Sequence, residues 1–367
     1  MEARLKPRQA LTALLLASLL ATLWAPFPAL AQEGANKPLT VYTAMTATTA
    51  QLPLLGAIKK GWPEGSQLKV EYWKNLEDLR ALVLAGKGEV WVGHLETLSR
   101  AAARGAPVSL VAVTVWRKFF FVSAPLPIGP GGAQAHPANV GDLLAAAAKN
   151  NLAVTMSPQN SPQANLLNEL KDIHGQFPVD SLPPQQLALE LIRGQRLIAL
   201  MPEPMASAAS LKDPNLKIIG SLEEEYSKNF GGDGFLPQAG VAVNLSLATG
   251  SPETVASLIR LMTATVEELR GKPVADKIAL FPPDAQEALG LPVLEATLGL
   301  EPLIIKSAAE AKGEVEDFLL LVTPELFEKD SSLPPSFFWD PAVFLPQAPE
   351  SPGSPGPGQP GPSPDAQ

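Results

Sequence analysis

A glutamate between two prolines stands out in the sequence as a group that could do chemistry. Pro202, Glu203 and Pro204 follow the apolar run 197–201 and precede small residues with good helix propensity. Parallel sheets bind ligands at such junctions of strand and helix, and the prolines would fix the direction of the carboxylate. The alternative is that Glu203 complements the positive end of the following helix dipole.

Hydroxyl and amide side chains gather at two other predicted strand-to-helix turns. The turn after the run 39–43 offers Thr43, Met45 and Thr46. The turn after the run 152–156 offers Ser157, Gln159, Asn160 and Ser161. Donors at a helix N-terminus suit an anion such as a sulfonate or a carboxylate, although ordinary helix caps would look the same. We predict that both turns contribute ligand contacts.

Two further strand ends complete the predicted ligand site, which has no catalytic or metal-binding residue. His94 follows the strand predicted over 89–93, and Thr114 lies near the end of the strand predicted over 108–116. The three histidines are far apart in sequence and no cysteine is present, so no metal site and no cofactor are predicted. The motifs Gly-x-Ser-x-Gly, Gly-x-x-x-x-Gly-Lys-Ser/Thr and His-Glu-x-x-His are also missing, which indicates a binding protein and not an enzyme.

The elements that must position these residues alternate between strand and helix. Predicted strands cover residues 39–43, 68–73, 89–93, 108–116, 152–156, 179–182, 197–201 and 241–244. Asn75 is a good cap for the helix that follows the second strand, and Gly86 ends that helix. Short helical crossovers require mostly parallel sheets, so we predict the α/β class with two such units in series.

Both ends of the chain differ in composition from the part between them. Arg4, Lys6 and Arg8 precede the apolar run 11–24, and a small-x-small pattern ends at Ala31. This pattern is typical of a signal peptide, 1–31, cleaved after Ala31, which places the mature protein in the periplasm. Residues 346–367 contain eight prolines and four glycines, which predicts a disordered tail.

The net charge of −9 makes nucleic acid and anionic membrane surfaces poor partners. The absence of cysteine excludes disulfides and a lipid anchor on a cysteine. No segment after the predicted signal peptide is long and apolar enough to span a bilayer, so we expect no membrane insertion. A small anionic ligand remains compatible with this charge, because the chemistry of a local site can oppose the overall charge.

Several stretches, in this order, resemble the periplasmic solute-binding proteins of ABC importers, in the branch for nitrate, alkanesulfonates, taurine and thiamine precursors. These are LEDLRALVLAG at 76–86 with EVWVG at 89–93, GAPVSLVA at 105–112, VTMS at 154–157, PEP at 202–204 and GVAVN at 240–244. Trp91 departs from the family pattern, which often has an aspartate at that place.

The resemblance implies a two-lobed binding-protein fold with mostly parallel sheets and two crossing segments. Lobe 1 would comprise 37–121 and 241–335, and lobe 2 would comprise 122–240. The segments crossing between the lobes would lie near 119–124 and 237–241. The implied partners are a small ligand held between the lobes and a membrane permease driven by a separate ATPase, with the binding protein a monomer.

Our interpretation is a periplasmic receptor that delivers a small polar, anionic solute to an importer. Glu203, if it faces the ligand, favours instead a cationic compound such as a pyrimidine precursor of thiamine, and the sequence does not decide between these ligands. Two alternatives are a secreted enzyme built on the same fold and an interaction protein that transports nothing.

Overall fold

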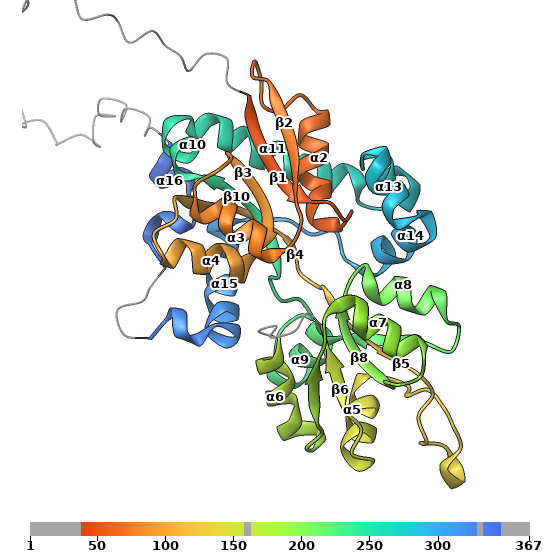
Figure 1. Ribbon diagram of the computed structural model, residues 1–367. Coiled ribbons are helices and arrows are strands. Elements are labelled where there is room, and N and C mark those ends of the chain that lie inside the picture. The colour runs from red at the N-terminus through yellow and green to blue at the C-terminus, as the bar shows by residue number, and fades with distance from the viewer. Residues whose placement is uncertain (1–37, 158–162, 329–332, 346–367) are drawn as a thin grey trace, which may run out of the picture. The chain divides into compact units, whose positions relative to one another are not determined.

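The computed structural model describes residues 38–157, 163–328 and 333–345, which form two β-sheets covered by helices (Figure 1). The first sheet has six strands in the order β11-β4-β10-β3-β1-β2, and the second has five in the order β7-β6-β8-β5-β9. The strands of the first sheet are β1 (Leu39–Ala44), β2 (Leu68–Trp73), β3 (Val90–His94), β4 (Val108–Val115), β10 (Ala239–Asn244) and β11 (Lys306–Ser307). Those of the second sheet are β5 (Phe119–Ser123), β6 (Val154–Met156), β7 (Val179–Ser181), β8 (Ile198–Pro202) and β9 (Lys217–Ser221). The predicted α/β fold with two lobes is confirmed.

Each sheet is mixed and not mostly parallel, because β10 and β11 in the first sheet and β5 in the second run antiparallel to the strands beside them. β1 pairs in parallel with β2 and β3, but β10 lies between β3 and β4 and is antiparallel to both. In the second sheet β5 occupies the same kind of place between β8 and β9. β5 and β10 are the strands with which the chain enters a sheet after leaving the other sheet, and therefore no helical crossover sets their direction.

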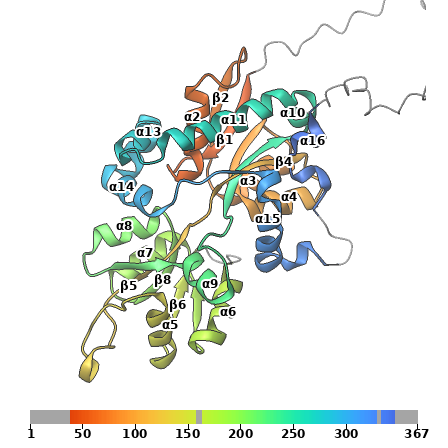
Figure 2. The same cartoon turned by 180° about the vertical axis from the view of Figure 1, so that it is seen from behind.

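Helices cover both faces of each sheet (Figure 2). The helices up to the end of the second sheet are α2 (Leu52–Lys59), α3 (Leu76–Leu84), α4 (Leu95–Ala103), α5 (Val140–Lys149), α6 (Ala164–His174), α7 (Pro184–Ile192), α8 (Met205–Lys212) and α9 (Leu222–Phe230). The later helices are α10 (Leu245–Gly250), α11 (Pro252–Leu269), α12 (Val274–Ile278), α13 (Pro283–Leu289), α14 (Leu291–Leu300), α15 (Ala308–Val322) and α16 (Pro341–Phe344). Short 3-10 helices are η2 (Thr49–Gln51), η3 (Pro130–Gly132), η4 (Pro324–Leu326) and η5 (Pro335–Phe337).

The alternation of side chains along β4 shows how one strand serves two cores. Leu110 belongs to the core shared with α3, α4 and α15, whereas Val111 belongs to the core shared with α2, α10 and α11. Successive residues of a strand point to opposite faces, so a fully apolar strand such as β4 must be covered on both faces. α3 forms where predicted, with the Asn75 side chain accepting a hydrogen bond from Asp78 N at 2.8 Å.

The chain passes between the sheets in short connections. The first connection is residues 116–118, which is earlier than predicted, because Phe119–Ser123 is β5 and pairs with β8 and β9. The return runs from the end of α9 to Ala239, the first residue of β10. The lobe boundaries given above, 37–121 with 241–335 and 122–240, stay a prediction.

A C-terminal segment, 333–345, packs against the first sheet. Trp339 N donates to Leu110 O at 2.8 Å, and a parallel bridge joins Leu110 to Phe338. Phe337 and Trp339 are buried. The predicted signal peptide and the predicted tail, 346–367, lie outside the described residues. Within the described ranges, no helix combines the length and the apolar character needed to cross a membrane.

Candidate functional site: a cavity lined by both sheets

A cavity of about 840 Å³ is lined by residues from both sheets. The first sheet contributes the loop after β1, the start of α3 and the ends of β3 and β4. The second sheet contributes the ends and loops around β8, α7 and α6. This is the place at which α/β sheets bind ligands, outside the carboxyl ends of their strands. The volume falls within the range of about 300–1,000 Å³ that is typical of small-molecule sites.

Glu203 lines this cavity, but its carboxylate is also bonded within the protein. The side chain is buried, and its Oε1 accepts from Ser207 Oγ at 2.9 Å. Its Oε2 accepts from Thr297 Oγ1 at 2.9 Å and from Ser207 N at 3.4 Å. Since α8 begins at Met205, the carboxylate lies at the N-terminus of that helix, as the alternative interpretation expected. Burial raises the pKa of Glu203, and the nearby Glu301 raises it further.

Lys118, in the connection between the sheets, carries a buried ion pair. Its Nζ lies 2.9 Å from Glu301 Oε1, and both side chains are almost completely buried. Glu301 Oε2 accepts from Thr49 N at 3.3 Å and from Thr49 Oγ1. The positive charge that Lys118 brings to the cavity wall is therefore neutralised within the protein.

Two further titratable groups lie near this connection, the buried Glu223 and the half-buried His94. Glu223 Oε1 accepts from Lys118 N at 2.9 Å and from Phe119 N at 3.2 Å, whereas its Oε2 has no partner among the residues that the structure describes. Burial raises the pKa of Glu223 to about 7. Burial, and secondarily the charge of Lys118, lowers the pKa of His94 to about 4. His94 lines the cavity as a neutral imidazole at neutral pH.

Two buried donor atoms belong to residues of the cavity lining and have no partner among the described residues. They are Nε of Arg80, on α3, and Nε2 of Gln238, just before β10. No ion pair joins Arg80 to another described residue, and Gln238 uses only its Oε1, which accepts from Gln163 Nε2 at 3.1 Å. A buried donor without an acceptor is costly, so a ligand that brings acceptor oxygens would stabilise both groups.

The structure brings together four of the residues predicted to bind ligand. Met45, Thr46, His94 and Glu203 line the cavity. Thr43, Thr114 and Ser157 do not line it and are buried. Thr114 Oγ1 donates to Ala50 O at 3.2 Å, whereas the hydroxyls of Thr43 and Ser157 have no partner among the described residues. Gln159, Asn160 and Ser161 lie outside the described residues.

Arg80, Gln163 and Gln238 were not predicted from the sequence. Arg80 lies on α3, a helix whose sequence shows mainly the apolar positions that pack on the core. An arginine on such a helix is expected to be exposed to solvent. The sequence could have indicated Gln238 as a site residue, because it falls within the segment 237–241 that the resemblance placed between the lobes. Trp91, which departs from the family pattern, is buried and donates from Nε1 to Lys87 O at 3.0 Å. It is therefore part of the hydrophobic core.

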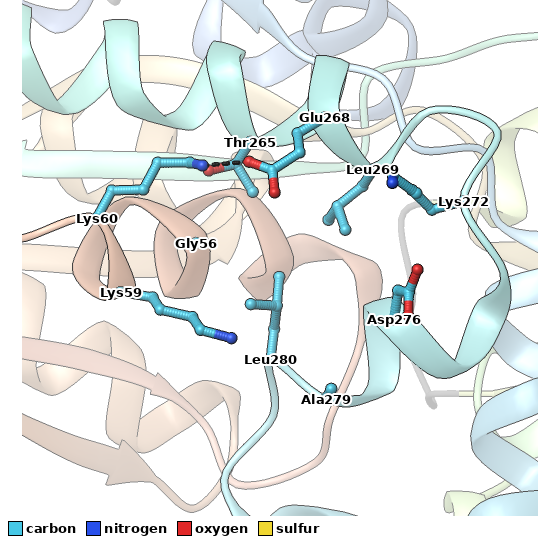
Figure 3. Close-up of a pocket in the computed structure, with 10 residues that line it drawn as sticks. All are labelled: Gly56, Lys59, Lys60, Thr265, Glu268, Leu269, Lys272, Asp276, Ala279 and Leu280. Carbon is cyan, nitrogen blue, oxygen red and sulfur yellow. Dashed lines mark hydrogen bonds and ion pairs between the residues drawn. The ribbon is translucent and has the colours of Figure 1, made fainter.

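A second cavity, of about 430 Å³, lies between α2, α11 and α12 (Figure 3). Its charged residues partly neutralise one another, because Lys60 pairs with Glu268 and both are partly exposed. None of its described polar side-chain atoms is buried without a partner. It therefore lacks the unsatisfied donors that distinguish the first cavity.

The fold is that of the periplasmic binding proteins of ABC importers, as the comparison with solved structures shows. The chain is similar to the periplasmic aliphatic sulphonate binding protein SsuA from Escherichia coli, with a TM-score of 0.60 and 15% identity over 83% of this chain and 98% of that one. It is similar to the alkanesulfonate-binding protein SsuA from Xanthomonas axonopodis pv. citri bound to MOPS, with a TM-score of 0.54 and 17% identity over 84% of this chain and 98% of that one.

An ABC transporter from Parabacteroides distasonis gives a TM-score of 0.56 and 17% identity over 83% of this chain and 99% of that one. The similarity thus extends over nearly the whole length of each of these proteins, and at these identities it is a similarity of fold. No family model and no curated protein sequence matches the chain.

Proposed function

We propose that this protein is the solute-binding component of an ABC importer and that it holds a small anionic organic solute in the 840 Å³ cavity. The observation that carries the proposal is the pair of unsatisfied donors, Arg80 Nε and Gln238 Nε2, on residues that line a cavity between two sheets. A single ligand would contact residues from both sheets. Its affinity would therefore be higher for an arrangement of the sheets that presents both sets of residues than for one that presents a single set.

Arg80 favours an anion over a cation in this cavity, whose lining also includes the charged residues Lys74, Glu77 and Glu96. Lys118 is neutralised by Glu301, and the carboxylate of Glu203 already accepts hydrogen bonds from Ser207 and Thr297. Arg80 is left without a counter-ion among the described residues. A monoanionic head group with acceptor oxygens, such as a sulfonate or carboxylate, matches Arg80 and Gln238 together. The aromatic side chains of Trp73, Phe119 and Phe318 would contact an apolar body.

The proposal includes the setting of the protein. The mature chain would begin at Gln32 in the periplasm, act as a monomer and deliver its ligand to a membrane permease with a separate ATPase. Residues 37–121 with 241–335 and residues 122–240 would form its two lobes. Intact mass of protein from the periplasm would give the start of the mature chain.

A binding screen with a matched pair of variants tests the ligand. Alkanesulfonates including MOPS, nitrate, carboxylates and pyrimidines are added to purified protein while thermal unfolding is followed. A binder present at a hundred times its dissociation constant stabilises the folded state by about 2.7 kcal/mol. For the best anionic binder, Arg80→Met should weaken affinity by roughly ten- to a hundredfold, since hydrogen bonds to charged groups are worth about 1.5–3 kcal/mol.

Arg104→Met removes an exposed arginine that does not line the cavity and should leave affinity unchanged. Equal affinity in the wild type and Arg80→Met would overturn the assignment of Arg80. Stabilisation by pyrimidines alone would replace the anion with a cationic or neutral ligand, and a screen without any stabilising compound would count against the receptor.

A further inference from the structure

The last turn of α14, taken here to include its C-cap residue Glu301, contacts the site loops of both sheets. Thr297 and Glu301 are four residues apart, and Glu301 N donates to Thr297 O at 3.0 Å, so the helical spacing brings both side chains to one side of this turn. α14 packs beside α8, which follows β8 (Figures 1 and 2). From there, Thr297 donates to Glu203, in the loop after β8, at 2.9 Å.

Glu301 makes the matching contact to the first sheet. Its carboxylate accepts from both the backbone N–H and the hydroxyl of Thr49, the first residue of η2. The loop from Ala44 to η2 supplies Met45, Thr46 and Thr48 to the cavity wall. Because the buried Glu301 carboxylate also pairs with Lys118, it fixes this loop to the connection between the sheets.

We propose that the last turn of α14 is a bridge that links the two cavity loops, after β1 and after β8, with Glu301 and Thr297 as positioning residues. Three other hydrogen bonds hold the first loop: Gln51 Nε2 donates to Ala44 O at 2.6 Å and to Thr46 O at 3.2 Å, and Thr114 Oγ1 donates to Ala50 O at 3.2 Å. All of these come from the first sheet or from the loop itself. Among the described residues, Glu301 makes the hydrogen bonds that tie this loop to α14, and Ala47 of the loop also shares an apolar cluster with Leu294 and Leu298 of that helix.

A pair of double variants tests the first half of the bridge without leaving a buried charge unpaired. Lys118→Met with Glu301→Gln keeps an acceptor oxygen for Thr49, whereas Lys118→Met with Glu301→Leu removes it. Both remove the ion pair, and replacing a buried pair by uncharged groups of similar size is usually tolerated. The readout is hydrogen–deuterium exchange by mass spectrometry on a peptide covering 44–52.

Exchange in this peptide should be roughly tenfold faster in the Leu variant than in the Gln variant, because only the Leu variant lacks the acceptor for Thr49 N–H. Equal exchange in the two variants would overturn the role of Glu301. Equal loosening of the loop in both variants, compared with the wild type, would assign the effect to the lost ion pair and would overturn the role of the Thr49 contact.

Thr297→Val and Ser207→Ala form the matched pair for the second half, because each removes one hydroxyl donor to Glu203. Thr297→Val should speed exchange in 203–208 and also in 291–300, whereas Ser207→Ala should affect 203–208 alone. If both variants left 291–300 at the wild-type rate, α14 would not be a bridge.

The consequence for binding rests on the proposed function and is measured with MOPS as the probe. MOPS affinity should fall at least tenfold in the Leu variant compared with the Gln variant, and equal affinities would mean that the bridge does not serve the ligand. Should MOPS fail to bind the wild type, the sulfonate part of the proposed function fails, while the exchange experiments still decide whether the bridge exists.

Discussion

Glu223 offers a direct test of the electrostatics at the connection between the sheets. It lies in the first turn of α9, is completely buried and uses one carboxylate oxygen for two backbone N–H groups, those of Lys118 and Phe119. Its other oxygen has no partner within the described part of the chain. The Glu223→Gln substitution keeps the shape and one acceptor oxygen and removes the titrating group.

The expected magnitude follows from the pKa of Glu223. Burial raises this pKa from 4.5 to about 7. Between these values the unfolded chain has lost the proton and the folded protein has kept it, so stability falls as pH rises. At 1.36 kcal/mol per pH unit, the wild type loses about 3 kcal/mol of unfolding free energy from this group between pH 4 and pH 8.

The Gln variant does not undergo this loss. Its unfolding free energy minus that of the wild type should therefore increase by about 3 kcal/mol from pH 4 to pH 8, with most of the change between pH 4.5 and 7. The assay is urea unfolding followed by tryptophan fluorescence at constant ionic strength, with Glu64→Gln as a control for loss of an exposed carboxyl group. A difference independent of pH, or one that decreases with pH, would refute the reasoning.

Two further predictions concern stability. His94→Gln should show the opposite pH dependence, because the pKa of His94 is lowered to about 4. The wild type loses stability as pH falls from 6.5 to 4, so in urea titrations the variant should gain up to about 3 kcal/mol on the wild type over that range, and a flat difference would contradict this. Trp339→Ala should lower the unfolding free energy by about 3–5 kcal/mol, since Trp339 is buried against the first sheet. Calorimetry checks this, and a loss below about 1 kcal/mol would mean that 333–345 is not part of the core.

Local signals in the sequence predicted most elements. Asn75 caps α3 and Gly86 follows it at positive φ, as the residue types required. The run at 119–123 was instead assigned to a crossing segment. Its residues are apolar on both faces, so the sequence shows that it is buried but not that it pairs with β8 and β9. Likewise, no local pattern shows that β10 enters the first sheet between β3 and β4.

The candidate site was predictable where a residue type is unusual for its position. The Pro-Glu-Pro turn marked Glu203, and the order of strands and helices placed His94 and Thr46 near it. Glu301 was missed, because its partner Thr49 is 252 residues away in the sequence. A buried acid at the end of a helix has no sequence signature until the fold shows which cation it meets.

Lys118 contacts three glutamates that are buried at one place, Glu203, Glu223 and Glu301. Residues 116–118 lie between strands, so their backbone groups need partners other than a sheet. Lys118 N donates to the Glu223 carboxylate, Lys118 O accepts from Glu203 N at 3.0 Å, and Lys118 Nζ pairs with Glu301. The N–H, the carbonyl oxygen and the ammonium group of Lys118 therefore all have partners, and these partners come from both halves of the chain.

Lys118→Met alone should therefore be far more damaging than its combination with Glu301→Gln. The single variant leaves the Glu301 carboxylate buried without its cation, which costs about 3–5 kcal/mol, whereas the double variant removes both charges. Urea unfolding at pH 7 should show the double variant to be at least 2 kcal/mol more stable than the single variant, because most of that cost comes from the unpaired charge. If the two variants were equally stable, the Lys118 side chain would contribute through packing alone, and Glu301 would not depend on it as a counter-ion.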